Sequence, residues 1–157
     1  MVEDFLDIIE TRRDICDLQK PRSYGEKIQF PEDVAGLTTE GLGQLMMKLT
    51  AHRGYALYQL SITDVRYAGV KSLYEDEYRK VTSVLDTNKK TRVTVQQEAL
   101  DASKELRDLK ELMDRLAAEV GLLDRLQKIY EIQITSLSRE LSRRHMEMEK
   151  SKISPGM

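Results

Sequence analysis

The last third of the chain carries the most regular alternation of apolar and polar positions. From residue 102 onward, apolar side chains recur alternately four and three residues apart for more than five heptads, which is the a/d repeat of a coiled coil. The only polar residue among the twelve positions is Gln127. The positions are Ala102, Leu106, Leu109, Met113, Leu116, Val120, Leu123, Gln127, Tyr130, Ile134, Leu137 and Leu141. This pattern predicts one long helix that packs against a partner helix.

A second apolar strip lies beside the first in the middle of this helix. It consists of Leu112, Leu122, Leu126 and Ile129. One partner helix needs only the first strip, so the second predicts a further contact, either from the N-terminal segment or from another subunit. We therefore expect homo-oligomerisation.

The pattern of apolar and polar positions divides the whole chain into four parts. Residues 1–20 have a helical apolar stripe with acids in the first turn and predict an accessory helix. Residues 21–37 contain prolines and no clear period, and predict a linker. Residues 38–150 predict two long helices joined by a polar turn near 86–93, and residues 151–157 form a tail. The fold class is therefore all-α, a long antiparallel helical hairpin resembling a coiled coil, with a short N-terminal helix.

The amino-acid composition agrees with long helices and indicates in which cellular compartment the protein is expected. The chain has 157 residues, of which 40% are hydrophobic and 33% charged, and its formal net charge is -2. The single cysteine, Cys16, excludes an internal disulfide and fits a reducing compartment. Neither a signal peptide nor a membrane-spanning run is recognisable. We expect a soluble cytoplasmic protein.

Motifs of enzymes are missing from the sequence. It has no glycine-rich phosphate loop, no CxxC and no histidine pair at metal-ligand spacing. His52 and His145 are far apart, and we expect surface roles for both. These observations favour a protein that is not an enzyme, with no catalytic residue, metal site or cofactor.

Basic residues cluster at the predicted turn, where residues 79–92 hold five cations against one acid. The cations are Arg79, Lys80, Lys89, Lys90 and Arg92. They are suited to contact the phosphates of a nucleic acid. A solvated turn with basic residues near a helix C-terminus explains them equally well.

A second basic cluster lies in SLSRELSRRH, residues 136–145. Arg144 is expected to pair with Glu140 four residues earlier, which leaves Arg139 and Arg143 available to bind phosphate. Basic residues late in a helix also suit its dipole without any ligand. In an oligomer the cluster would recur once per subunit and gain strength by avidity.

Tyrosine is the other enriched residue, with seven against two phenylalanines. Most of the tyrosines fall on the two long helices. Stacking platforms for single-stranded bases are one interpretation, and half-buried interface residues are the one we favour.

Two stretches carry a resemblance to a known family. FPEDVAGLTTEGLGQLMMKLTAHRGYALYQL, followed by a long polar hairpin and then YEIQITSLSRELSRR, resembles small helical proteins of tailed phages related to the UvsY-like recombination mediators. The resemblance covers roughly residues 30–146. It rests on the arrangement of helices and on the SLSRELSRR ending.

This resemblance implies a ring-forming protein that binds single-stranded DNA and helps a RecA-like recombinase displace single-strand-binding protein, in the host cytoplasm if phage-encoded. It implies no nucleotide hydrolysis. The basic positions that correspond to the family's DNA contacts are Lys71, Arg79 and Lys80. The overall acidic charge departs from that of a dedicated DNA binder. The alternative is a coiled-coil scaffold or adaptor protein of a phage, which would not bind nucleic acid.

Overall fold

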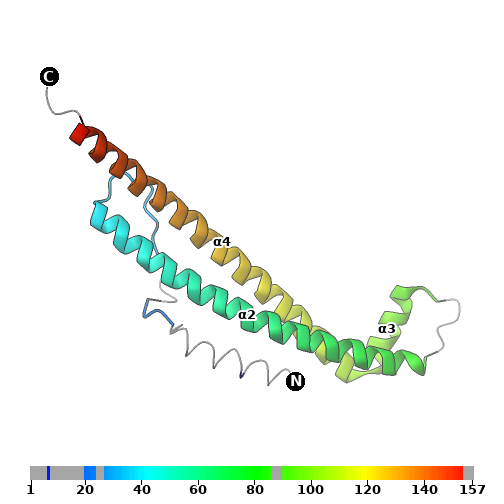
Figure 1. Ribbon diagram of the computed structural model, residues 1–157. Helices are drawn as coiled ribbons and strands as arrows, with labels where there is room; N and C mark the ends of the chain where they lie inside the picture. The colour runs from blue at the N-terminus through cyan, green and yellow to red at the C-terminus, as the bar shows by residue number, and fades with distance from the viewer. Residues whose placement is uncertain (1–6, 8–19, 24–26, 86–89, 154–157) are drawn as a thin grey trace. The chain divides into compact units, whose positions relative to one another are not determined.

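The computed structural model describes residues 7, 20–23, 27–85 and 90–153. The N-terminal helix expected over residues 1–20 lies almost wholly outside the described residues, as do residues 154–157 of the expected tail. The described part contains three helices and no strand (Figure 1). They are α2 (Thr39–Ser83), α3 (Arg92–Ala102) and α4 (Lys104–Ile153). The long helices α2 and α4 pack against each other, so the predicted all-α helical hairpin is confirmed.

The described residues form two compact units. We call residues 20–58 with 123–153 the linker unit, because it contains the segment before α2. We call Asp7 with residues 59–122 the turn unit, because it contains the connection between α2 and α3. Each unit takes part of both long helices.

In the linker unit, the contacts between α2 and α4 show that the helices are antiparallel. Thr39 at the start of α2 contacts Arg144 late in α4, whereas Arg53, about four turns further along α2, contacts Glu131 earlier in α4. The order of partners along the two helices is therefore reversed.

The apolar core of the linker unit is centred on Leu42, Leu49 and Leu137, all fully buried. Part of the linker covers this core, since Ile28, Phe30, Val34 and Leu37 pack against it. Helix α2 begins beside this cover. The Thr38 hydroxyl accepts a hydrogen bond from the Gly41 backbone N–H at 3.0 Å, which makes Thr38 the N-cap of α2.

In the turn unit, α2 ends where two hydroxyl side chains turn back onto the helix. The Thr82 and Ser83 hydroxyls donate to the Tyr78 and Lys80 carbonyls at 2.7 Å each, in competition with the helical ladder. Helix α3 begins after Thr91, whose side chain accepts from the Thr94 backbone N–H. The turn predicted near 86–93 thus falls between Ser83 and Arg92.

The second arm of the hairpin, residues 92–153, consists of two helices. Its periodicity predicts a single helix. Ser103 separates α3 from α4 with an extended backbone, at φ -125° and ψ 119°. Its hydroxyl accepts from the Leu106 backbone N–H at 3.1 Å and caps α4. The apolar period continues through this position, so it gives no signal of the break.

From Leu106 onward, the a/d positions are all buried or half-buried, as predicted, and Ala102 before the break is exposed. Gln127 is buried at 8% exposure, and its side-chain Oε1 has no hydrogen-bond partner within the described part of the chain. The second strip remains largely open, since Leu112, Leu122 and Ile129 are 42%, 66% and 50% exposed. The further contact expected for this strip stays a prediction.

Candidate nucleic-acid interface

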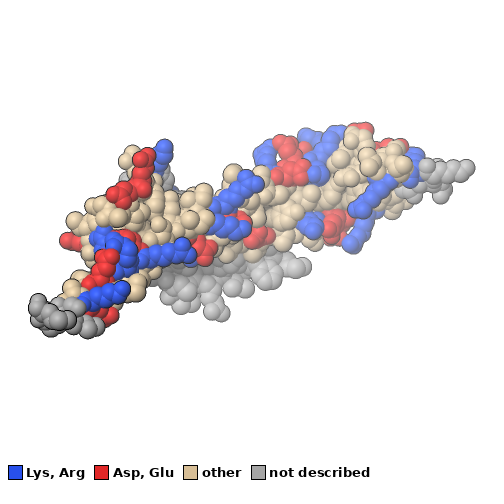
Figure 2. Space-filling view, turned by 90° about the horizontal axis from the view of Figure 1, so that it is seen from above, with Lys and Arg blue, Asp and Glu red and all other residues tan. Residues whose placement is uncertain are grey.

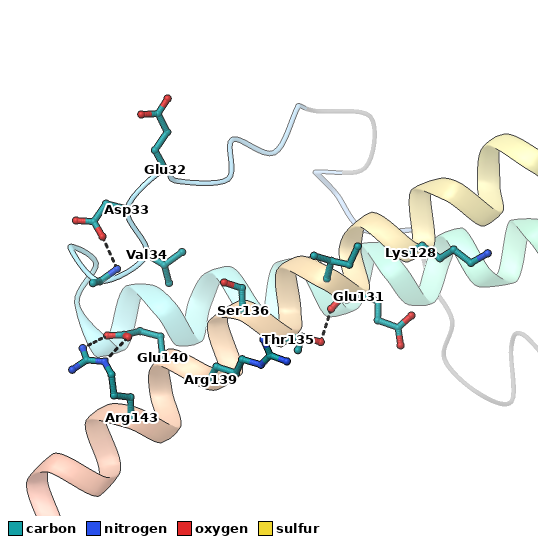
Figure 3. Close-up of a pocket in the computed structure, with 12 residues that line it drawn as sticks. Glu32, Asp33, Val34, Lys128, Glu131, Thr135, Ser136, Arg139, Glu140 and Arg143 are labelled. Atoms are coloured by element: carbon teal, nitrogen blue, oxygen red, sulfur yellow. Dashed lines mark hydrogen bonds and ion pairs between the residues drawn. The ribbon is translucent and has the colours of Figure 1, made fainter.

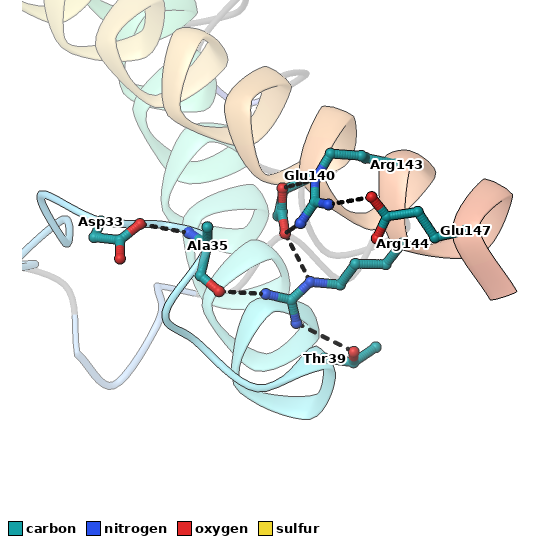
Figure 4. Close-up of polar contacts among 7 residues, drawn as sticks. All are labelled: Asp33, Ala35, Thr39, Glu140, Arg143, Arg144 and Glu147. Atoms are coloured by element: carbon teal, nitrogen blue, oxygen red, sulfur yellow. Dashed lines mark hydrogen bonds and ion pairs between the residues drawn. The ribbon is translucent and has the colours of Figure 1, made fainter.

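Arg144 joins the C-terminal part of α4 to the linker (Figure 4). Its guanidinium donates to the Ala35 carbonyl at 2.8 Å, to the Thr39 hydroxyl at 3.3 Å and to the Glu140 carboxylate at 2.7 Å. Asp33 fixes the same stretch of linker by accepting from the Ala35 N–H at 3.0 Å. The predicted pairing of Arg144 with Glu140 is confirmed. With its donors occupied in this way, Arg144 serves as a structural tether.

Arg143 is also engaged, and the expectation that it is available for phosphate is wrong. It donates two hydrogen bonds to Glu140, at 2.8 and 2.6 Å, and one to Glu147 at 2.5 Å. Hydrogen bonds from Arg143 and Arg144 lower the pKa of Glu140 to about 2. The carboxylates of Glu140 and Glu147 in turn raise the pKa of Arg143. A phosphate would have to displace these carboxylates.

Arg139 is the cation of this cluster that remains open. It is exposed and makes no hydrogen bond or ion pair within the described part of the chain. It borders a groove of about 1070 Å³ between the linker and α4 (Figure 3). Glu32 and Asp33 line the linker side of the groove, and Ile132 contributes apolar surface on α4. The groove is therefore mixed in charge, with carboxylates on the linker wall and both carboxylates and cations, Arg139 among them, on the α4 wall.

The basic residues at the turn are mostly paired with nearby acids. Arg79 lies 3.6 Å from Asp76, Lys80 3.4 Å from Glu77, and Lys90 2.7 Å from Glu98. These pairs agree with the alternative interpretation of the cluster, in which the cations belong to solvated helix surfaces.

Three further predicted DNA contacts are Lys89, Arg92 and Lys71. Lys89 lies outside the described residues. Arg92 is exposed at the start of α3, and Lys71 is exposed on α2. Neither makes an ion pair with any residue that the structure describes. Among the predicted DNA contacts in the described part of the chain, those that make no ion pair are thus Lys71, Arg92 and Arg139.

The contacts bring Arg143 and Arg144 together around Glu140, whereas no contact among the described residues joins the other candidates to this pair. On the face shown in Figure 2, basic and acidic side chains lie next to one another along the helices. Arg66 and Arg125 are further exposed cations without an ion pair in the described ranges. The sequence did not single them out because each is isolated among acids and apolar residues.

His52 differs from its prediction, since it is 1% exposed rather than on the surface. Its Nε2 lies 2.6 Å from the Ser23 hydroxyl, and its ring meets that of Tyr130 edge-on at 5.9 Å. A signal for this burial is present in the sequence, because His52 stands in helical register between Leu49 and Ala56. His145 is exposed, as expected, and lies 3.3 Å from Glu149.

The tyrosines of the helices are half-buried or buried, which agrees with the favoured interpretation. The rings of Tyr74 and Tyr78 stack on each other, 6.1 Å apart and 18° from parallel. Burial raises the pKa of Tyr130. Base stacking on these rings would require the existing contacts to open.

Within the described ranges, no group of three or more histidine, cysteine, aspartate or glutamate side chains is arranged to hold a metal ion. A search of the same residues finds no helix with the length and apolarity needed to cross a membrane. The geometry defines the protein as an all-α helical hairpin with charged, largely self-paired surfaces. No protein-family model, curated protein or solved structure matches the chain significantly.

Proposed function

We propose that the protein is a non-enzymatic recombination mediator that binds single-stranded DNA as a homo-oligomer and assists a RecA-like recombinase. The support comes from the family resemblance together with one observation, the exposed Arg139 beside the groove without an ion pair in the described part. Lys71 and Arg92 are the other predicted DNA contacts that make no ion pair with a described residue. Phosphate contacts of this kind are electrostatic and need no catalytic group.

The small number of predicted DNA contacts that remain open bears on the mechanism. Within the described part of the chain, three of these predicted contacts lack an ion pair while several others are paired with acids, so the predicted contacts give a single chain little affinity for a polyanion. An oligomer that holds several copies on one strand multiplies the contacts, so avidity supplies the affinity. Self-association is therefore part of the proposed activity.

The test is the binding of a fluorescent single-stranded oligonucleotide over a series of salt concentrations. We expect Lys71→Ala, Arg92→Ala and Arg139→Ala each to weaken binding and to reduce the salt slope, by about 0.7 for each phosphate that the variant no longer binds. Arg115→Ala is the matched control, because Arg115 is not a predicted DNA contact and pairs with Glu111. Wild-type protein that fails to bind at low salt, or three variants that bind like the control, would refute the DNA-binding proposal.

The second candidate is a helical assembly protein that binds other proteins and no nucleic acid. It is favoured by the pairing of five of the predicted DNA contacts with acids and by the exposure of Leu122 on α4. We expect Leu122→Lys to weaken self-association in sedimentation experiments. Ala117→Lys, an exposed position on another face of the same helix, should leave it unchanged. Self-association without DNA binding would favour this candidate.

A further inference from the structure

The break between α3 and α4 consists of a single residue. Ser103 alone leaves the helical conformation, and α3 turns away from the direction of α4 (Figure 1). All the residues concerned belong to the turn unit. A break this short preserves the two flanking helices and changes only their relative direction.

Three of the backbone groups that the break releases have side-chain partners. The Ser103 hydroxyl accepts from the Leu106 N–H, while the Ser103 N–H keeps its helical hydrogen bond to the Ala99 carbonyl at 3.1 Å. Arg107 donates to the Leu100 and Asp101 carbonyls, at 3.2 and 3.3 Å, and so satisfies the end of α3. The Ser103 and Arg107 side chains thus bind the Leu106 N–H and the Leu100 and Asp101 carbonyls, which the break removes from the helical hydrogen-bond pattern.

The sequence also encodes the continuous form. Val95, Ala99, Ala102 and Leu106 follow one another at spacings of four, three and four, which continues the a/d repeat of α4 back through α3. No glycine or proline occurs between residues 92 and 120. In the bent form Ala99 and Leu106 are buried while Ala102 between them is exposed. A continuous helix would return Ala102 to the same stripe.

We infer that Ser103 is a two-state joint, at which residues 92–102 alternate between the bent arrangement and one that is coaxial with α4. In the bent state the Ser103 and Arg107 side chains take over part of the backbone hydrogen bonding, and in the coaxial state ordinary helical hydrogen bonds form. The bent state thus recovers part of the hydrogen bonding that separates it from the coaxial state, which allows both to be populated. The coaxial state lengthens the continuous a/d stripe. The state of the joint therefore determines the length of apolar stripe that can pack against another helix. This inference does not rest on the proposed function.

The test measures a distance across the joint by pulsed electron paramagnetic resonance. Spin labels at Val93 and Glu119, both exposed, are introduced in a Cys16→Ser background. Labelled chains are diluted with unlabelled protein so that only distances within one chain are measured. In a continuous helix the two positions are separated by about 39 Å, from 26 residues at 1.5 Å each, and the bent form gives a shorter distance. We expect two populations in the wild type.

Two substitutions of the same residue bias the joint in opposite ways. Ser103→Ala removes the cap and favours a helix interior, so we expect a shift of roughly tenfold toward the longer distance. Ser103→Asp retains an N-capping side chain and should keep the bent population. A single shorter distance that Ser103→Ala leaves unchanged would overturn the inference, as would a single distance near 39 Å in all three proteins.

Discussion

The linker unit and the turn unit share the same two long helices, yet their polar side chains make different kinds of contact. In the linker unit, Arg144 reaches a carbonyl 109 residues away, and Arg53 crosses from α2 to Glu131 on α4. In the turn unit, the ion pairs described above join residues three to eight positions apart. Short-range pairs support individual helices, whereas contacts between distant residues determine which surfaces meet.

This difference shows where the tertiary structure is specified. Ion pairs within one helix contribute about 0.2 to 0.5 kcal/mol each and favour helix in any arrangement of the arms. The linker unit adds a fully buried apolar cluster and a linker that is tied to both long helices. The relative placement of α2 and α4 therefore depends most on the linker unit.

The largest expected effect is the loss of a core side chain from the linker unit. Leu137→Ala removes a fully buried side chain, and we expect the free energy of unfolding to fall by about 2 to 5 kcal/mol in urea titrations. Leu73→Ala in the turn unit is the control and should stay within about 0.5 kcal/mol, since Leu73 is exposed. Equal losses in the two variants would contradict the comparison.

A smaller effect is expected when the tether is removed. Arg144→Ala leaves the Ala35 carbonyl without its donor, and we expect a loss of about 1 to 2 kcal/mol. Hydrogen exchange should rise in residues 33–39. Arg79→Ala, which removes an exposed local pair of the turn unit, should cost less than about 0.5 kcal/mol and leave that exchange unchanged. An Arg144→Ala protein with wild-type exchange in the linker would show that the tether is dispensable.

The smallest effect concerns acid stability. Glu140 has a pKa of about 2 in the folded protein against an ordinary value of 4.5, so its ionised form stabilises the fold. That contribution is fully present above pH 4.5 and is lost as the pH falls toward 2. Glu140→Gln should therefore unfold with a weaker pH dependence over this interval than the wild type. Identical slopes for the two proteins, in thermal unfolding at a series of pH values, would argue against the role of Glu140.

The hairpin and its core face follow from the sequence because periodicity reports burial directly. The prediction that the a/d positions from Leu106 to Leu141 face the core is confirmed. The break at Ser103 was missed because serine is tolerated within helices and the apolar period continues across it. The break becomes visible only in the structure, through the contacts that the Ser103 and Arg107 side chains make with the backbone.

The candidate site was predicted less well, for a different reason. Clustering in sequence locates cations but not their partners. Arg143 is held by acids three and four residues away, a pairing that competes directly with phosphate. The contact of Arg144 with Ala35 depends on tertiary structure and has no local signal. Arg139 was selected correctly as an open cation, whereas its function stays a proposal.

The long separation between Ala35 and Arg144 also bears on how the chain folds as it is synthesised. The turn unit draws its described residues from Asp7 and 59–122, so all of them are available before the later half of α4 leaves the ribosome. The linker unit must wait for Leu137 and Arg144, and until then Leu42 and Leu49 lack their partner from α4. During that interval the early part of α2 exposes apolar surface. Synthesis thus allows the turn unit to close before the contacts of the linker with α4 can form.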